Sequence, residues 1–278
     1  MKTLIIASIS LLMLSCSQNL KKETMCFEKV LYEELTPTEF RERIAKAPVA
    51  YLPLGTIEWH GEHLPLGSDG LQSKGFFEML ARETGGIVYP MIFMGPDRKQ
   101  VIDEKDYYGM DYSVREETSH YFYPAQQLDG SSYWMAEEDF RVMLEAILKQ
   151  ISRAGFRVVV AHGHGPSTNF VISHAEEWEE QFGLKILNCW GYRDDEGMGI
   201  MVDHAAMNET SLVMALYPDM VHMEYLPADT ARWPLGVSGQ DPRIHASAEK
   251  GEKILSIQKE RMVSLIKNAL QEIQNQSQ

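Results

Sequence analysis

The stretch "FRVVVAHGHGPSTNF", residues 156–170, changes from an apolar run to a glycine-rich turn and then to a polar segment. The continuous apolar run Val158–Ala161 predicts a strand buried on both faces, because a strand with one wet face would alternate. Ser167 or Thr168 then suits the N-cap of a helix, which Gly183 would end. The stretch therefore predicts a strand, a loop and a helix in succession, the repeating unit of an α/β fold.

The same alternation extends in both directions along the chain. Short apolar runs predict four buried strands, at Val49–Gly55, Gly86–Phe93, Phe156–Gly163 and Leu184–Gly191. Apolar residues at helical spacing predict three helices, at Ala136–Gly155, Ser167–Gly183 and Ser247–Ile273. We expect a single α/β domain with a mainly parallel sheet covered by helices on both faces. A long, less regular insert at Pro96–Tyr133 is typical of a lid or an oligomer contact.

The composition limits the size and the partners of the protein. The chain has 278 residues, of which 44% are hydrophobic, enough for a sizeable core. Its 40 acidic and 26 basic residues give a net charge of -14. This charge argues against a nucleic-acid partner, because phosphate binding requires a basic face. A small molecule is the partner that we expect.

The N-terminal segment "MKTLIIASISLLMLSCSQN" differs from the rest of the chain. A lysine precedes an apolar run that is too short to span a bilayer, which is the pattern of a signal peptide. The cysteine that follows resembles the lipidation site of bacterial lipoproteins. We expect residues 1–15 to be a signal peptide, Cys16 to carry the lipid, residues 16–27 to form a tether and residues 28–278 to fold.

This pattern predicts an exported protein of the bacterial cell envelope, facing the periplasm or the cell surface. Membrane attachment would come only from the lipid anchor. Ordinary cleavage, with Cys16 as an incidental thiol, is the alternative. Cys26 and Cys189 could pair in an exported protein, but sequence does not bring their Cα atoms within bonding distance, and we expect free or buried thiols.

A second informative stretch, "GTIEWHGEHLPLGSDG" at residues 55–70, holds two histidines and three carboxylates among glycine, proline and apolar residues. It follows the first predicted strand, where α/β sheets place their binding sites. Glu58 and His60 share one side of an extended segment, and the glycine and proline that follow allow a turn that returns Asp69 to them. We expect these three side chains to converge.

Two more loops add histidines and carboxylates. His162 and His164 end the strand of the opening stretch on one side, and "MVDHAAMNETS" supplies Asp203, His204 and Glu209. Mixed nitrogen and oxygen ligands suit Zn, Mn or Fe rather than calcium, which prefers oxygen alone. Each residue also has a structural interpretation, because a histidine can hydrogen-bond the backbone and a carboxylate can cap a helix.

Four segments together resemble the signatures of the creatininase (creatinine amidohydrolase) family. "PLGTIEWHGEHLPLGSD" resembles its Gly-Ser-x-Glu-Gln-His-Gly-Pro-His-Leu-Pro-x-x-Thr-Asp segment, and "VVVAHGHGPSTN" resembles its Asn-Gly-His-Gly-Gly-Asn segment. "HAAMNETS" is similar to its His-Ala-Gly-x-x-Glu-Thr-Ser segment, and "LGVSGQDPRIHASAEKG" to its Gly-Val-x-Gly-Asp-Pro ending, with Gln240 as an extra residue. The order and spacing agree from Val49 to the final helix.

The resemblance implies a metal-dependent hydrolase with one or two divalent ions per chain. The positions that match the family's metal ligands are Glu58, His60, Asp69 and His164. In two-metal members Asp69 would bridge the ions, Glu58 and His164 would complete one, and His60 would help to hold the other. Two ions bridged in this way activate a water for attack on an amide. Zn is the expected ion, with Mn or Fe as alternatives.

His204 and Glu209 match the family residues near the substrate, and we expect them to be catalytic. His204 would carry a proton to the leaving nitrogen, because histidine titrates near neutrality. Glu209 would either orient His204 or ligate the second ion, and sequence alone leaves both roles open.

Several positions depart from the family pattern. Creatininase has a glutamate two residues after the histidine of the second segment, whereas Pro166 stands here without a ligand atom. The site could therefore be mononuclear or could use Glu209 instead. His162 replaces the usual asparagine and would be an extra ligand, a neighbour of a ligand or a histidine bonded to the backbone, while His63 would at most neighbour the ligands. The other replacements are Trp59 for glutamine, Glu62 for proline and Ala206 for glycine.

The substrate is the least defined feature. Creatininase closes tryptophans over creatinine, and the segment "GYRDDEGMGIMVD" before His204 has none, so creatinine itself is not expected. Arg98, Lys99, Tyr107 and Tyr108 in the insert could line another pocket or lie in a solvated or subunit-facing loop. We predict a homo-oligomeric amidohydrolase that cleaves a cyclic amide, a formamide or a similar C–N bond. The alternatives are a metallophosphoesterase and a catalytically inactive, lipid-anchored binding protein on the same fold.

Overall fold

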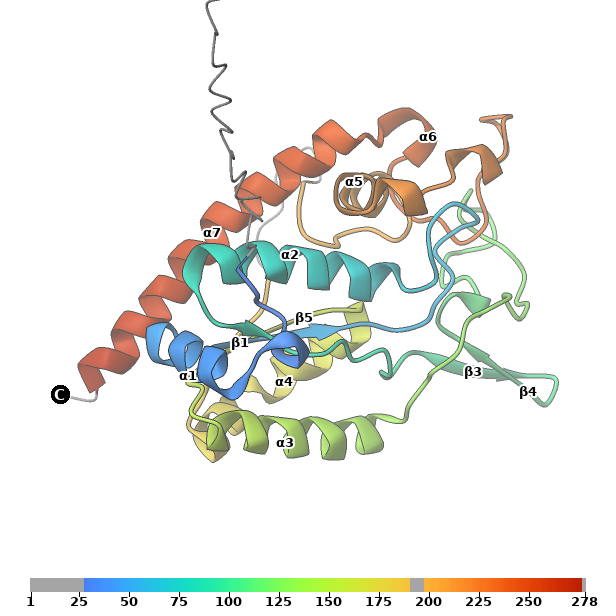
Figure 1. Cartoon of the computed structure of the whole chain (residues 1–278). Coiled ribbons are helices and arrows are strands. Elements are labelled where there is room, and N and C mark those ends of the chain that lie inside the picture. Colours follow the sequence, from blue (N-terminus) through green and yellow to red (C-terminus); the bar gives the residue numbers. More distant parts are fainter. Residues whose placement is uncertain (1–27, 191–197, 277–278) are drawn as a thin grey trace, which may run out of the picture.

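The centre of the protein is a four-stranded parallel sheet. The structure is a computed structural model that describes residues 28–190 and 198–276, so the predicted signal peptide, Cys16 and Cys26 lie outside the described residues. The strand order is β2-β1-β5-β6, and every neighbouring pair is parallel. Helices lie above and below this sheet (Figure 1), which confirms the predicted α/β architecture.

The predicted apolar runs form the strands. The sheet consists of β1 (Val49–Leu54), β2 (Ile87–Val88), β5 (Val158–Gly163) and β6 (Lys185–Leu187). The two central strands, β1 and β5, are buried at every position, as expected for a strand covered on both faces. Their register places Leu54 opposite Gly163, so the loops that follow them leave the same edge of the sheet. The edge strands β2 and β6 are shorter than the sequence predicts.

Alternate side chains of β1 enter two separate hydrophobic cores. Val49 and Tyr51 pack with α2, α5 and α7, whereas Ala50 and Leu52 pack with α1, α3 and α4. The helices are α1 (Pro37–Lys46), α2 (Ser68–Thr84), α3 (Glu137–Arg153), α4 (Gly165–Phe182), α5 (Met207–Leu216), α6 (Pro242–His245) and α7 (Ala248–Gln276). Helices α3 and α7 match the predicted ranges closely. Each face of the sheet is therefore closed by its own set of helices.

Two predicted details at the edge of the sheet are wrong. Helix α4 begins at Gly165, with His164 rather than Ser167 or Thr168 at the N-cap position; proline in the first turn is compatible with a helix start. Asp69, expected on a loop, lies in the first turn of α2. Glycines within α2 disfavour a helix in the sequence, which is why this helix was not predicted. Gly70 is required by the packing, because a Cβ there would lie 2.9 Å from the ring of Phe93.

The insert at 96–133 contains a small antiparallel hairpin. Its strands, β3 (Lys99–Ile102) and β4 (Lys105–Tyr108), project from the end of the molecule towards which β1 and β5 run (Figure 1). Single 3-10 turns lie at Tyr32–Glu34, Gly109–Asp111, Pro218–Met220 and Met223–Tyr225. The insert thus stands beside the edge of the sheet where the sequence places the candidate site.

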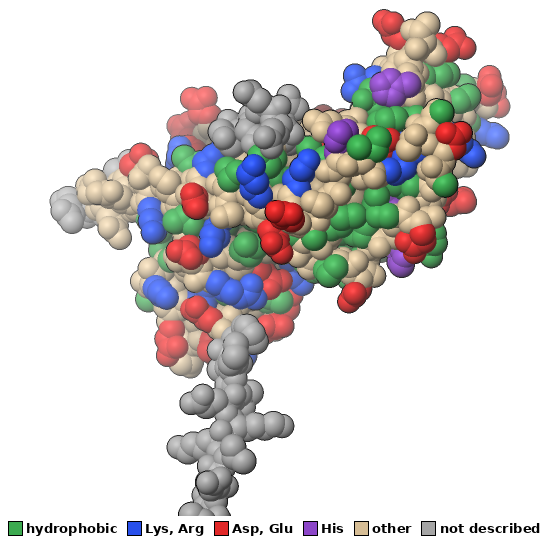
Figure 2. All heavy atoms as spheres, turned by 90° about the horizontal axis from the view of Figure 1, so that it is seen from above, with side chains coloured by type: hydrophobic (Ala, Val, Ile, Leu, Met, Phe, Trp, Pro, Cys, Tyr) green, Lys and Arg blue, Asp and Glu red, His purple; other side chains and the backbone are tan. Residues whose placement is uncertain are grey.

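Acidic and basic side chains are interspersed on the face that Figure 2 shows. Among the described residues, no helix is both long enough and apolar enough to cross a membrane.

Candidate metal centre

The loop after β1 carries the first two site residues. Glu58 is held by its backbone, whose N–H donates to the carbonyl of Leu66 at 2.9 Å. The Nδ1 of His60 lies 3.1 Å from the Glu58 carbonyl, and this contact assigns a proton to Nδ1 and turns Nε2 towards Asp69. Both side chains are almost fully buried. The loop therefore presents a carboxylate and an oriented imidazole nitrogen to the interior.

Asp69 joins this loop to the neighbouring strand. Its Oδ1 lies 3.2 Å from Nε2 of His60, and its Oδ2 lies 3.0 Å from Nδ1 of His164. Glu58 approaches the same His164 nitrogen at 3.5 Å. One carboxylate thus stands between two imidazoles, a position from which it could bridge two ions.

Gly163 explains how His164 reaches this cluster. Its φ is +154°, and a Cβ at this position would lie 1.5 Å from the carbonyl oxygen of Leu54. Only glycine permits this close approach of the two strand ends. Thr168 secures the turn by accepting a hydrogen bond from the Gly163 N–H and donating one to its carbonyl.

Glu209 enters the cluster from the first turn of α5. Its Oε2 accepts a hydrogen bond from the N–H of Ala205 at 2.7 Å and lies 3.7 Å from Nε2 of His60. Among the described residues, it makes no hydrogen bond to His204. Asp203 has the structural role of a cap, because its carboxylate accepts the backbone N–H groups of Asn208 and Glu209. The geometry therefore favours Glu209 as a ligand over Glu209 as an orienting group for His204.

These side chains form three overlapping groups whose donor atoms lie within 4.8 Å of one another. The groups are Glu58, Asp69 and His164; His60, Asp69 and Glu209; and Glu58, His60 and His204. The first two share Asp69, and each offers a mixture of carboxylate oxygen and imidazole nitrogen. This donor set fits Zn, Mn or Fe.

Buried charge perturbs the protonation of the cluster. Burial alone would lower the pKa of His60 and of His164, but Asp69 and the neighbouring carboxylates raise both above the usual value. Burial would raise the pKa of Asp69, yet the two imidazoles hold it well below its usual range. Burial raises the pKa of Glu58 to about 8 and also raises that of Glu209. Protons therefore occupy positions that a divalent cation would take.

His204 lies against this cluster. Its ring stacks on that of His60 with centroids 4.4 Å apart, and its Nε2 lies 2.8 Å from the carbonyl of Trp59. Burial and the neighbouring His60 lower the pKa of His204 to about 3. The ring is consequently neutral at pH 7, with its proton on Nε2 and Nδ1 unprotonated. This lowered pKa differs from the value near neutrality that the sequence led us to expect for His204, because burial and the adjacent His60 disfavour the charged ring.

Asp97 is a site residue that the sequence analysis missed. Its side chain is 3% exposed, and its Oδ2 lies 3.5 Å from Nε2 of His164, the nitrogen that faces away from Asp69. The nearby imidazole of His164 lowers the pKa of Asp97 against the effect of burial. Its position after the apolar run that ends near Phe93 was a usable signal, because carboxylates that follow strand-like runs lie at the site edge.

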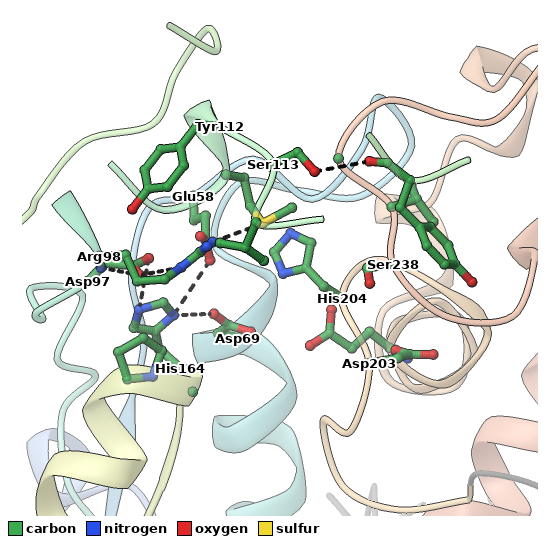
Figure 3. Close-up of a pocket in the computed structure, with 18 of the residues that line it drawn as sticks. Glu58, Asp69, Asp97, Arg98, Tyr112, Ser113, His164, Asp203, His204 and Ser238 are labelled. Atoms are coloured by element: carbon green, nitrogen blue, oxygen red, sulfur yellow. Dashed lines mark hydrogen bonds and ion pairs between the residues drawn. The ribbon is translucent and has the colours of Figure 1, made fainter. Parts of the chain in front are cut away.

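The cluster opens into a cavity of about 260 Å³ (Figure 3). Arg98 and Tyr112 from the insert line it opposite His204 and Ser238. The insert therefore contributes to the pocket, although Lys99, Tyr107 and Tyr108, the other insert residues considered from sequence, do not line it.

Four other residues singled out in the sequence do not join a ligand group. His162 is fully buried against Trp190, and burial lowers its pKa to about 3. His63 hydrogen-bonds the Thr210 hydroxyl at 2.9 Å. Cys189 is a buried free thiol. Ala206 adopts extended backbone, so its replacement of the family glycine requires no left-handed conformation.

Comparison with known proteins identifies relatives along most of the chain. The sequence model of a family described as "Creatininase: Creatinine amidohydrolase" matches residues 33–122 and 124–266. Creatinine amidohydrolase of Pseudomonas putida is 25% identical over 264 residues, which are 83% of this chain and 93% of that protein.

Solved structures with the same fold are also found. The structure named "Creatininase Mn" is 22% identical with a TM-score of 0.67, covering 87% of this chain and 99% of that chain. A mutant creatininase of "Zn-Zn type" is 22% identical with a TM-score of 0.64, over 87% of this chain and 99% of its own.

Proposed function

Because the chain belongs to the creatininase family, whose members are metal-dependent amidohydrolases, we propose that it cleaves a cyclic amide, a formamide or a similar C–N bond of a small molecule. The observation that carries this proposal is the pair of ligand groups that share Asp69 at the floor of a cavity. A pocket of this size suits a small substrate rather than a polymer.

We assign one ion to Glu58, Asp69 and His164 and a second to His60, Asp69 and Glu209. Glu209 takes the place of the ligand that Pro166 cannot supply, since its carboxylate is already turned towards His60. The ions are Zn, with Mn or Fe as alternatives that fit the same donors.

Such ions would supply an activated water and polarise the amide oxygen. The remaining steps would depend on the chain's own residues. The carboxylates of Asp69 and Glu58 are buried, and electrostatic effects are large in such an environment. Nδ1 of His204 is unprotonated, and we assign to it the relay of a proton from the nucleophile to the leaving nitrogen. The lowered pKa makes the ring a weak base and, once protonated, a strong acid, so delivery of the proton to the leaving nitrogen is the half of the relay that this ring favours. Its bond to the Trp59 carbonyl holds the ring in that orientation.

The metal content of the soluble domain, measured by mass spectrometry, tests the assignment directly. We expect two ions per chain in the wild type and one in Glu209→Gln, together with turnover of at least one member of a panel of cyclic amides and formamides by the wild type. Two retained ions in Glu209→Gln would contradict the ligand assignment. Full metal content without any turnover would favour the small-ligand binding protein, and turnover of phosphate esters alone would favour the phosphoesterase.

The cellular location and the assembly are proposals from the sequence. We propose that Cys16 is lipidated and anchors the domain in the cell envelope, and that the protein is a homo-oligomer. Palmitate labelling that persists in a Cys16→Ser variant would contradict the anchor, and a monomeric mass by light scattering would contradict the assembly.

A further inference from the structure

The wall of the cavity away from the metal ligands comes from the insert and carries positive charge. Leaving histidines aside, the basic side chains that line the cavity within the described ranges are Arg98 and Arg115. Neither arginine has a role in the activity proposed above. The contacts of each guanidinium indicate which kind of ligand the two arginines could bind.

Arg98 is fixed beside the ligand group of Glu58 and His164. Its Nη2 donates to the carbonyl of Gly109 at 2.9 Å, and its guanidinium lies 5.2 Å from the ring centre of Tyr112. Gly109 itself touches the site, because a Cβ there would lie 2.6 Å from oxygens of Glu58 and Asp97. Figure 3 shows Arg98 beside Asp97 and Glu58. Arg98 is therefore anchored by the backbone and by an aromatic ring.

Arg98 makes only a long ion pair with its neighbour. Its Nε lies 3.8 Å from Oδ1 of Asp97, which is longer than a hydrogen bond. Its side chain is 39% exposed, and a stacked guanidinium keeps donors on its edge for a ligand. Within residues 28–190 and 198–276, no hydrogen bond or ion pair engages its Nη1.

Arg115 occupies the opposite side of the cavity. Its Nη2 donates to the hydroxyl of Ser238 at 3.3 Å, and its guanidinium lies 5.7 Å from the ring centre of Tyr121. Ser238 is paired through its backbone with His204 by hydrogen bonds of 3.0 and 2.9 Å. In the part of the chain that the structure describes, no acidic side chain forms an ion pair with Arg115. A full positive charge thus lies on the side of the proposed proton carrier.

Divalent ions would neutralise the carboxylates of the ligand groups. Asp97, which belongs to none of these groups, would still face Nε of Arg98, whereas the charge of Arg115 would remain for a ligand together with the Nη1 donors of Arg98. A planar guanidinium matches a carboxylate with two parallel hydrogen bonds. A doubly charged phosphate suits the site less, because five carboxylates already line this small cavity: Glu58, Asp69, Asp97, Asp203 and Glu209.

We propose that the substrate is an amide that also bears a carboxylate, which Arg98 and Arg115 bind while the C–N bond lies over the Asp69 groups. This inference rests on the proposed function. It predicts discrimination between compounds that differ only by a carboxylate.

Matched pairs of cyclic amides test this discrimination: 5-oxoproline against 2-pyrrolidinone, hydantoin-5-acetic acid against hydantoin, and dihydroorotate against dihydrouracil. Binding is measured by calorimetry on the metal-loaded protein, with turnover and metal content recorded for the same preparation. In at least one pair, the carboxylate should increase affinity by about 10-fold or more, the size expected for a charged hydrogen bond. Arg98→Gln and Arg115→Gln should each remove most of that gain.

Arg153→Gln is the matched control, because Arg153 lies on α3 and does not line the cavity. It should keep the full preference. No preference in any pair would overturn the inference, as would a preference that survives in both cavity variants, since the carboxylate would then be bound by the metal ions. Absence of metal or turnover, with the arginine-dependent preference intact, would instead overturn the proposed function.

Discussion

Two clusters of buried charge in this protein differ in how completely their hydrogen bonds are satisfied. In the first, Asp241 receives hydrogen bonds from the Nε, Nη2 and backbone N–H of Arg243 at 2.7–3.2 Å. The same guanidinium donates to backbone carbonyls of Pro227, Asp229, Thr230 and Arg232. The carboxylate of Asp241 and the guanidinium of Arg243 thus satisfy each other's hydrogen bonds, and the guanidinium also holds the backbone of residues 227–232 in place.

The candidate metal centre has the opposite character. Its carboxylates outnumber the cations that face them, and the pKa values of Glu58 and Glu209 are raised because neighbouring charge and burial disfavour ionisation. Nε2 of His164 is buried without a hydrogen-bond partner. Buried polar groups are normally satisfied, and exceptions indicate an ion, a water or a functional role. The hydrogen bonds and charges of the Asp241 cluster are therefore satisfied by the protein's own groups. The Asp69 cluster has an excess of negative charge, which a bound cation would balance.

The strongest way to separate the two clusters is to replace their central aspartates by asparagine. Asp69→Asn should reduce the metal content from two ions to none, because Asp69 belongs to both ligand groups. Turnover should fall by about 10²- to 10³-fold or more, since removing one group that stabilises the transition state already has an effect of this size. Metal analysis and initial rates on the purified domain measure both effects.

Asp241→Asn is the control for that experiment, since it alters another buried aspartate, one that does not line the cavity. It should retain the full metal content. A metal loss as large as that in Asp69→Asn would mean that the loss reflects general unfolding, and circular dichroism of both variants would show it.

Asp97→Asn should have the next largest effect. Asp97 faces the nitrogen of His164 that points away from Asp69, and such a carboxylate orients a histidine ligand and strengthens its bond to the metal. Its loss should weaken metal affinity by about 10- to 100-fold. Competition with a metal-binding dye provides the measurement.

Asp106→Asn is the matched control, because Asp106 belongs to the same insert but pairs with Lys99 at the surface. It should bind metal as the wild type does. Equal affinities of Asp97→Asn and the wild type would show that Asp97 has no influence on His164.

The smallest expected effect is the loss of stability in Asp241→Asn. Removing the charge from a group that receives several hydrogen bonds should lower the free energy of unfolding by about 2 kcal/mol. Urea denaturation at pH 7 measures the difference from the wild type.

This difference should depend on pH. The Arg243 hydrogen bonds lower the pKa of Asp241 in the folded protein, so the unfolded chain binds the proton more readily. The stabilisation is complete above the unfolded pKa of about 3.9 and is lost as the pH falls through the lower folded value. The difference in the free energy of unfolding between the wild type and Asp241→Asn should therefore shrink as the pH falls below about 3.9. A gap that stays constant down to complete protonation would show that the charge of Asp241 contributes nothing.

Much of the fold could be predicted from the sequence. The strands β1 and β5 and the helices α3 and α7 have patterns that are strong locally: continuous apolar runs and stripes at helical spacing. Helices α2 and α5 were missed for two different reasons. In α2, glycines at packing positions interrupt the pattern of helix-forming residues. Helix α5 is buried on nearly every side, so it has no polar face and its sequence lacks the alternation of apolar and polar residues at helical spacing.

The sequence by itself determined the α/β class, the family and the three segments of the chain that carry the site, because motif spacing and apolar runs are local properties of the chain. These segments hold Glu58, His60, Asp69, His164, His204 and Glu209. Only the tertiary structure decided which of these side chains meet. The contact of Asp69 with His164 joins residues 95 positions apart, and it depends on the register of β1 with β5 and on the turn at Gly163. The same is true of the two cavity arginines, since their roles come from what they face across the cavity, which no local pattern encodes.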